Sequence, residues 1–562
     1  MSREAFERAV AALIEATRPS KANIQAATAA NRTLLAECDG LDQPALNLAL
    51  GQLAEGLAVR GVEHPALLAT ACAALVERGG NPRIALDPLL TRLEAVTRES
   101  LAYVKACRHA AGLPADAPAD DAVCIERHGA AVAGDTPKLG WAWRGLPYLC
   151  QAATAMLGRT RQAVARARAH PRLPALCRQL AEVREESTLA ALRYLSRMLD
   201  VLHNFDSAVD TLVDPEGPGQ LVLLACATVE HDAATVDAAA RDQALRRMAG
   251  ALRDDRLLFA ALLTRACEVL VERGGERTII LDTFLDRLAE TVPLAAEFVA
   301  ACRAEWSASA GRAHRGEEPD DEECIVATEW AVRERLPQQG WAWAGLGSMC
   351  LSLIALLSAS PVARRTARSH PTLLPRLEEI AEVSESEVLQ HLRFLIMVIR
   401  VLDDEELVVL HPEQRRGYRV RIGGILNLWQ LNTLLAGALV GDPAEGWLRG
   451  PRLDPRVVAA ARDCPVDPEA ARALASFDLF DWKGFRTDGT LEPRRALWHT
   501  ALPADIPLFG QSRVILLCKP SIKHEWNAGR ALERMTAHLR VEAMLSEAET
   551  LGWLDRIRRT VR

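Results

Sequence analysis

The sequence contains a long internal repeat, which restricts the chain to folds that use one unit twice. Segment 66–108 matches segment 261–303 without a gap, and 21 of the 43 positions are identical. Further along, GWAWRGLPYLC at 140–150 matches GWAWAGLGSMC at 340–350. The offset changes from 195 to 200 residues because the second unit has a longer segment before its "DD" pair, and insertions of this kind belong in surface loops. We therefore predict a duplicated unit of about 200 residues.

Apolar residues within each unit follow the period of a helix. In 65–80 they recur at i, i+3 and i+4, and Gly79-Gly80 provides a stop because glycine readily takes the left-handed conformation after a helix. Segments 84–108 and 187–202 show the same period. Up to about residue 402 we predict only helices, packed as antiparallel neighbours across short loops.

The tetrapeptide GWAW stands in both units, at 140–143 and 340–343. Its two tryptophans are two residues apart, and we expect them in an extended segment before a helix, with their rings on opposite sides. This interpretation predicts buried tryptophans at matching places. A solvent-facing pair in a cleft would instead indicate a binding site.

The last 160 residues have a different pattern. Segment 407–425 alternates around a glycine-bearing turn and predicts a hairpin, and SRVILLCKP at 512–520 predicts a buried strand. We predict helix for 426–441 and for the closing segment 527–561. The predicted fold is mainly α: a tandem duplication of an all-α helical domain, at 1–206 and 207–406, followed by a smaller α+β domain at 407–562.

The net charge, the hydropathy pattern and the cysteine content exclude several classes of protein. A net charge of −7 gives no global attraction for nucleic acid or anionic lipid. The charged N-terminus does not resemble a signal peptide, and we found no apolar run of 18 residues, so we predict no membrane span. Thirteen scattered cysteines without an export signal indicate reduced thiols. We expect a cytoplasmic protein, and its preference for arginine over lysine suggests a bacterial source.

Four cysteines recur in both units. Structural zinc sites usually present cysteines in closely spaced pairs, and no such pair occurs here. Free cysteine is commonly buried as a small apolar residue, so we predict packing, with no metal and no other cofactor. The matched pairs are Cys72/Cys267, Cys107/Cys302, Cys124/Cys324 and Cys150/Cys350.

Candidate catalytic residues occur only in the last region. KHEWNAGR at 523–530 begins like the zinc helix H-E-x-x-H, but position 528 is alanine and the match fails. His499, His524, Glu525 and Asp481 could still converge as acid and base groups. Phosphate-loop, dinucleotide and nucleophile-elbow motifs are absent. The sequence leaves open whether the protein is an enzyme, and we expect that it is not.

Basic segments recur in both units. Segment 159–178, around Val164, has six arginines and no acid, and its counterpart keeps Arg364, Arg365, Arg368 and Arg376. A duplicated basic helix could bind phosphates. The flanks and the whole chain are acidic, however, so we expect a solvated face or a patch for an acidic protein. Nucleic-acid binding is kept as a second alternative.

Other polar residues are also matched between the copies. They could form two equivalent sites, but we favour ion pairs and helix caps that both copies need in order to fold. The pairs are Glu77/Glu272, Arg78/Arg273, Asp87/Asp282 and Arg193/Arg393.

The predicted function is non-catalytic: a scaffold that binds another protein, with the C-terminal domain as the partner surface. Tryptophan is a frequent interface anchor, which makes the C-terminal tryptophans candidates, although each could instead fill the core. The first alternative is an enzyme with a site in 407–562 or in a groove between the copies. No oligomeric state is indicated. The binding candidates are Trp429, Trp447, Trp482, Trp498 and Trp526.

Overall fold

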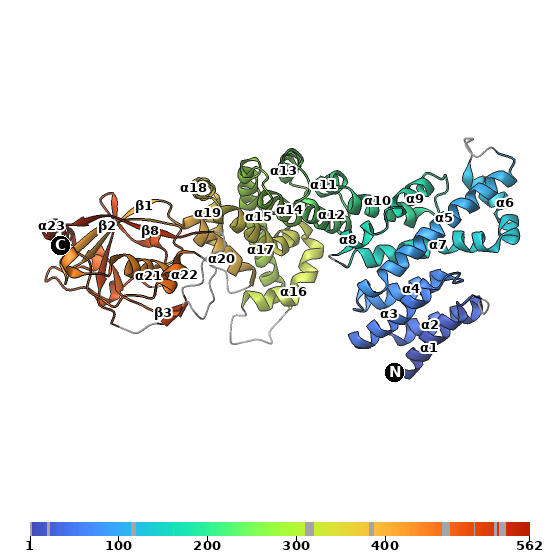
Figure 1. Ribbon diagram of the computed structural model, residues 1–562, viewed down its shortest axis with the longest axis horizontal. Helices are drawn as coiled ribbons and strands as arrows, with labels where there is room; N and C mark the ends of the chain where they lie inside the picture. The colour runs from blue at the N-terminus through green and yellow to red at the C-terminus, as the bar shows by residue number, and fades with distance from the viewer. Residues whose placement is uncertain are drawn as a thin grey trace. The chain divides into compact units, whose positions relative to one another are not determined.

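A computed structural model describes the chain as two compact units, Met1–Gly275 and Glu276–Arg562 (Figure 1). The described residues are 3–19, 23–113, 120–160, 162–309, 320–381, 387–463, 472–498, 501–521, 525–527 and 535–561. Within these ranges the protein is mainly helical, with one small mixed sheet near the C-terminus, as predicted.

The described part of the first unit contains helices and no strand. Long helix α5 is central, since it packs against α3, α6, α7 and α9. The helices are α1 (Arg3–Ala16), α2 (Ile24–Glu37), α3 (Gln43–Ala58), α4 (Pro65–Glu77), the 3-10 turn η1 (Pro82–Ile84), α5 (Leu86–Ala110), α6 (Asp121–Asp135), α7 (Pro137–Leu157), α8 (Ala163–Arg168), α9 (Leu173–Ala181), α10 (Ala190–His203), α11 (Phe205–Val213), α12 (Gly219–Asp232), α13 (Ala238–Leu252) and α14 (Ala260–Glu272).

Two predictions for this unit, the end of α4 and the position of α5, are confirmed. Helix α4 ends just before Gly79, whose φ of +101° is the left-handed conformation that glycine tolerates. The predicted long helix over 84–108 is α5. Its buried residues recur every three or four positions and form a continuous apolar stripe.

The second unit begins with a similar series of helices. Helix α15 packs against α16, α17 and α19, and α20 covers α17. The elements are η2 (Arg277–Ile279), α15 (Leu281–Ser309), α16 (Asp321–Arg335), α17 (Pro337–Ser358), α18 (Pro361–Ser369), α19 (Leu373–Ala381) and α20 (Glu387–Arg400). Matched sequence segments thus form elements of the same type, such as α6 and α16. Domain duplication and the bounds 1–206, 207–406 and 407–562 stay predictions.

Helix α17 is long and apolar enough to cross a membrane, the only such helix in the described ranges. Of its most apolar stretch, 61% is buried inside the protein. A core helix of a soluble protein has these properties, so packing against α15 and α20 accounts for its composition. The cytoplasmic location stays a prediction.

The prediction of an extended GWAW segment is wrong. Both copies lie inside a helix, α7 or α17, which begins three residues earlier at a proline suited to the first helical turn. Trp143 and Trp343 are buried, each 6% exposed. Trp141 and Trp341 are 38% and 37% exposed, so burial was predicted correctly for only one ring of each pair. In a helix, residues two apart lie on different sides, and only one side of α7 or α17 at this point faces the core.

The C-terminal region is an α+β structure built on one sheet. The hairpin predicted at 407–425 is β1 (Glu405–His411) with β2 (Arg416–Gly423), and the strand predicted at 512–520 is β6 (Ser512–Cys518). The other elements are α21 (Leu428–Leu439), η3 (Pro443–Glu445), α22 (Pro455–Arg462), β3 (Arg472–Leu474), β4 (Asp478–Asp481), η4 (Trp482–Gly484), η5 (Pro493–Arg495), η6 (Pro503–Asp505), β5 (Leu508–Phe509), β7 (Glu525–Asn527), β8 (His538–Leu545) and α23 (Glu547–Val561).

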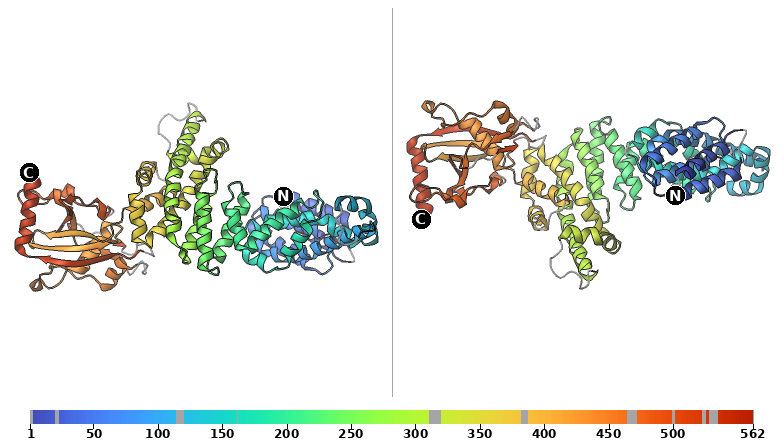
Figure 2. Two further views of the ribbon diagram at one scale, coloured as in Figure 1. Left: turned by 90° about the horizontal axis from the view of Figure 1, so that it is seen from above. Right: turned by 90° about the horizontal axis from the view of Figure 1, so that it is seen from below.

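The strands have the order β4-β6-β1-β2-β8, with β5 paired to β6 and β3 paired separately to β7. Strands β1 and β6 are parallel, and the other pairs are antiparallel. Alternate residues of β1 enter two cores. Leu407 and Val409 contact the core of α21 and α22, whereas Val408 and Leu410 contact the core of α23. The sheet therefore has helices on both faces (Figure 2).

The prediction of a continuous closing helix over 527–561 is wrong in part. Residues 538–545 form β8, which pairs with β2 at the edge of the sheet, and among the described residues of this span only α23 is helical. Residues 528–534 lie outside the described residues. Strand β8 is rich in helix formers, but its Leu539 and Val541 pack against the sheet core. Tertiary pairing here overrides local helix propensity.

Candidate functional site

Of the four predicted catalytic side chains only that of Asp481 is described, so their convergence stays a prediction. His499 and His524 lie outside the described residues, and Glu525 is described only as backbone of β7. Asp481 is buried and caps η4: its Oδ1 accepts a hydrogen bond from the Gly484 N–H at 3.2 Å, and its Oδ2 lies 4.0 Å from Arg495 Nη1. Its position therefore has a structural explanation. The described ranges contain no cluster of three or more potential metal-binding side chains.

His411, which the sequence did not single out, is a buried titratable group of the sheet. Its ring packs edge-on against Phe477 at 6.5 Å, and its Nε2 lies 3.3 Å from Gln414 Nε2. Burial lowers the pKa of His411, against a smaller opposing effect of Glu413. The imidazole is therefore uncharged at neutral pH, which suits a packing role.

The five candidate tryptophans occupy different environments. Trp447 is half-buried, lies parallel to Tyr418 at 6.3 Å and packs on the core of α21 and α22, as Trp482 packs on the core of α23. Trp429 is half-buried in α21, and the side chain of Trp526 lies outside the described residues. Trp498 is 80% exposed. Trp482 belongs to an aromatic cluster at the surface.

This cluster, here called the aromatic face, consists of Trp482, Phe509 and Trp553. Trp482 meets Phe509 at 5.0 Å in an edge-on arrangement, and Phe509 lies 6.0 Å from Trp553. All three rings are half-buried, and the adjoining Leu508 is 53% exposed. The Trp482 Nε1–H donates to the Leu508 carbonyl at 3.2 Å, which fixes its ring to β5.

Two cations extend over the rings of the aromatic face. Arg556 Cζ lies 4.1 Å from the ring centre of Trp553, and Lys483 Nζ lies 5.7 Å from that of Trp482. Within the described ranges neither side chain forms an ion pair. The acids of α23 have other partners, since Glu547 binds Arg415 and Asp555 binds Arg558. The face therefore presents uncompensated positive charge beside aromatic surface.

Local structure explains how three distant segments form this face. The cap by Asp481 places Trp482 directly after β4. Gly510, with φ of +67°, makes the tight turn between β5 and β6, and this turn places Phe509 beside Trp482. Helix α23 is held by Leu554 and Ile557 in the core, so the preceding Trp553 lies at the core's margin.

Several arginines of the two basic segments are bound internally. Arg166 pairs with Asp87, and Arg168 forms two hydrogen bonds of 2.5 and 2.6 Å with Asp232. In the second copy Arg364 binds Asp403 at 2.5 Å, and both side chains are 4% exposed. These arginines are therefore not free to bind phosphate, whereas Arg159, Arg172 and Arg365 are exposed, and the nucleic-acid alternative stays a prediction. Val164 itself is buried.

One matched polar pair, Arg193/Arg393, makes equivalent structural contacts in both copies. Arg193 donates to the carbonyls of Ala181, Val183 and Glu185, and Arg393 donates to that of Ala381. Both arginines thus bind carbonyls at the end of the preceding helix. Arg78 binds Asp39 at 2.5 Å.

The eight matched cysteines are all buried. Burial raises the pKa of the thiols of Cys72 and Cys350 to about 12. Such thiols are poor nucleophiles at neutral pH, and their environment is that of packed core residues.

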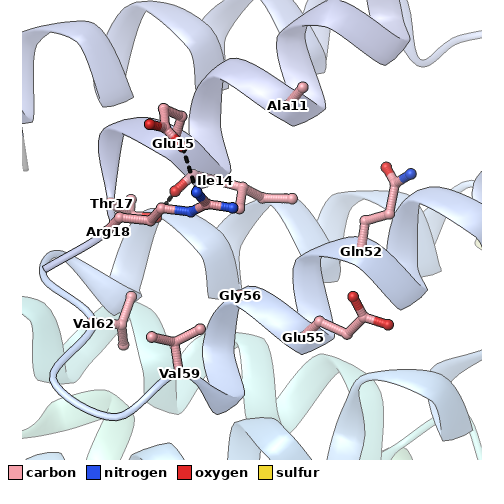
Figure 3. A pocket seen from close by; sticks show the side chains of 10 residues that line it. All are labelled: Ala11, Ile14, Glu15, Thr17, Arg18, Gln52, Glu55, Gly56, Val59 and Val62. Carbon is pink, nitrogen blue, oxygen red and sulfur yellow. Dashed lines mark hydrogen bonds and ion pairs between the residues drawn. The ribbon is translucent and has the colours of Figure 1, made fainter. Parts of the chain in front are cut away.

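A groove of about 530 Å³ lies between α1 and α3 in the first unit (Figure 3). Glu15 and Arg18, on one side, form an ion pair of 2.9 Å, while Gln52 and Glu55 line the other side. The hydroxyl of Thr17 donates to main-chain carbonyls of its own helix at 3.0 and 3.1 Å, so it is not poised as a nucleophile. The groove offers polar contacts but no activated group.

No protein-family model, curated protein or solved structure matches this chain.

Sequence reasoning missed Phe509, Trp553 and both cations of the face. Trp553 and Arg556 are three residues apart on a correctly predicted helix, a spacing that places them on one side and could have indicated the pair. Phe509 lies in a two-residue strand, and no periodicity could have indicated its partners.

Proposed function

We propose that this protein is a non-catalytic scaffold that binds another protein through the aromatic face of its C-terminal region. One observation carries the proposal: Trp482, Phe509 and Trp553 form a half-buried surface over which Lys483 and Arg556 extend without an ion pair in the described structure. Aromatic side chains and arginine are enriched among the residues that dominate binding energy in protein interfaces.

The chemistry of the face indicates the kind of partner. The rings favour an aliphatic or aromatic side chain, since they offer apolar area whose conformation is already fixed by packing. The two cations favour carboxylates beside that side chain. We therefore expect an acidic segment with an apolar anchor. Neither the enzyme alternative nor the nucleic-acid alternative has a comparable supporting observation.

Site-specific photo-crosslinking tests the proposal in the full chain. A photoreactive phenylalanine analogue replaces Leu508, which adjoins the face, and in a second variant it replaces Leu223 on α12. The side chains at these two positions are equally accessible to solvent, with exposed fractions of 53% and 52%. In cells of the source organism we expect protein adducts from position 508 that position 223 does not give. Identical adduct patterns, or none from position 508, would contradict the proposal.

A further inference from the structure

Helix α16 carries an apolar stripe on the side that faces away from its neighbours. Cys324, Ile325 and Val332 are buried on the inner side, where α16 packs against α15 and α17. On the outer side Val326 and Trp330, one turn apart, are each 76% exposed. The "α16 stripe" is Glu323, Val326, Ala327, Trp330, Ala331 and Glu334, all exposed.

The fold does not require these apolar residues. Helix α6 (121–135) occupies the positions of α16 (321–335) shifted by 200 residues, and its exposed positions are the same as those of α16. There Glu126 stands in place of Val326, and Ala130 in place of Trp330. The two helices differ in what they present to solvent, so folding alone does not explain the tryptophan.

The ends of the stripe are acidic. Glu323 and Glu334 form no ion pair among the described residues. The nearby cations are engaged: Arg333 pairs with Glu329 and lies over Trp341, and Arg335 binds Glu305 at 2.6 Å. Negative charge therefore flanks an apolar centre, and the two glutamates are about 16 Å apart along the helix.

We propose that the α16 stripe binds an amphipathic helix of another protein, with an apolar stripe flanked by lysine or arginine at both ends. Trp330 and Val326 have the one-turn spacing of anchors in helix recognition, and the adjoining alanines allow close approach. A second copy of this chain fits poorly, because a parallel pair of stripes would place Glu323 beside Glu323, and an antiparallel pair would place it beside Glu334. This inference does not rest on the aromatic face.

The test uses the full chain and a labelled synthetic peptide, an amphipathic helix with a leucine stripe and lysines in its first and last turns. Fluorescence anisotropy measures its binding to the wild type and to V326E/W330A, which carries the residues that α6 has at these positions. The control is V362E on α18, where Val362 is 60% exposed. We expect V326E/W330A to weaken binding about tenfold or more and V362E to change it less than about twofold.

A second peptide has glutamates in place of the terminal lysines, and we expect it to bind the wild type at least about fivefold more weakly. Equal binding to the wild type and V326E/W330A would overturn the proposal, as would equal binding of the two peptides. Light scattering tests whether the stripe instead joins two copies of this chain. If V326E/W330A converts a wild-type oligomer to a monomer, the stripe is an interface between copies and the proposal is wrong.

Discussion

The guanidinium of Arg108 holds the buried carboxylate of Asp121 through two hydrogen bonds, Nε–Oδ1 of 2.6 Å and Nη2–Oδ2 of 3.0 Å. Arg303 and Asp321 form the same two-pronged pair in the second copy. Each pair joins the end of a long helix to the first residue of the next one. The second pair spans more residues than the first, mainly because α15 has 29 residues and α5 has 25, so the insertion expected in a surface loop lies largely in the helix. The pair forms in spite of this difference.

Removal of the Asp121 charge should loosen this connection. Asp121→Asn is expected to lower the local free energy of unfolding of α5 and α6 by about 1–3 kcal/mol, because a buried charged hydrogen bond is lost. Amide hydrogen exchange of 103–113 and 121–135 measures the change. Glu126→Gln, on the exposed side of α6, is the control and should have little effect. Unchanged exchange in Asp121→Asn would show that the pair is not needed.

The effect of this substitution should depend on pH. Burial raises the pKa of Asp121, but hydrogen bonds from Arg108 and the Arg184 N–H outweigh burial and leave this pKa below its ordinary value. A lowered folded-state pKa stabilises the protein above the unfolded-state value of about 3.9, and this contribution disappears as pH falls through the folded-state pKa. The difference between wild type and Asp121→Asn should therefore shrink below about pH 4.

The two tryptophans of one GWAW copy should contribute unequally to stability. Trp143 is 6% exposed and stacks on Tyr103 at 5.6 Å, whereas Trp141 is 38% exposed. Trp143→Ala should cost about 3–5 kcal/mol, because it leaves a cavity. Trp141→Ala should cost about 1 kcal/mol. Urea unfolding of the two variants measures this, and equal costs would contradict the assignment of inner and outer rings.

Arg364 should be needed chiefly because Asp403 is buried beside it, although its Nη1 also donates to the carbonyls of Leu357 and Ser358 at 3.0 Å. The matched position in the first copy is Val164, also buried. Arg364→Val should destabilise the second unit by about 3–5 kcal/mol, since the carboxylate keeps only Arg368 at 3.4 Å. Adding Asp403→Asn removes the buried carboxylate charge that has lost Arg364, and it should recover part of the lost stability. Thermal unfolding of the single and double variants measures this recovery, and its absence would count against the argument.

Sequence patterns predicted those elements whose own residues determine them. Leu86 to Leu93 already show the buried stripe of α5, and alternation around Gly417 indicated the β1–β2 hairpin. The sequence patterns failed where contacts with residues far away in the sequence determine the local structure. His538–Leu545 becomes a strand because β2 offers an open edge, and Trp141 stays 38% exposed, with the ring of His64, at the start of α4, lying 5.1 Å from its own. The aromatic face needed three segments that meet only in the folded chain, so only Trp482 was indicated in advance.

The matched cysteines should be inert in the folded protein. Burial raises the pKa of Cys177 to about 12 and that of half-buried Cys518 to about 11. With iodoacetamide at pH 8, peptide mapping should find Cys72, Cys267 and Cys350 labelled only after unfolding, and Cys518 labelled sooner. Rapid labelling of Cys72 or Cys267 in the native chain would contradict simple packing.

Charge reversal on the aromatic face tests whether this surface binds a protein partner. K483E/R556E reverses two exposed cations of the face, whereas R449E/R452E makes the same change in charge at exposed positions elsewhere in the domain. Full-length wild type and both variants are purified from cells of the source organism, and co-purifying proteins are quantified by mass spectrometry. We expect at least one partner to be recovered about tenfold less with K483E/R556E and equally with R449E/R452E. Recovery of the same proteins in the same amounts with all three would contradict the account.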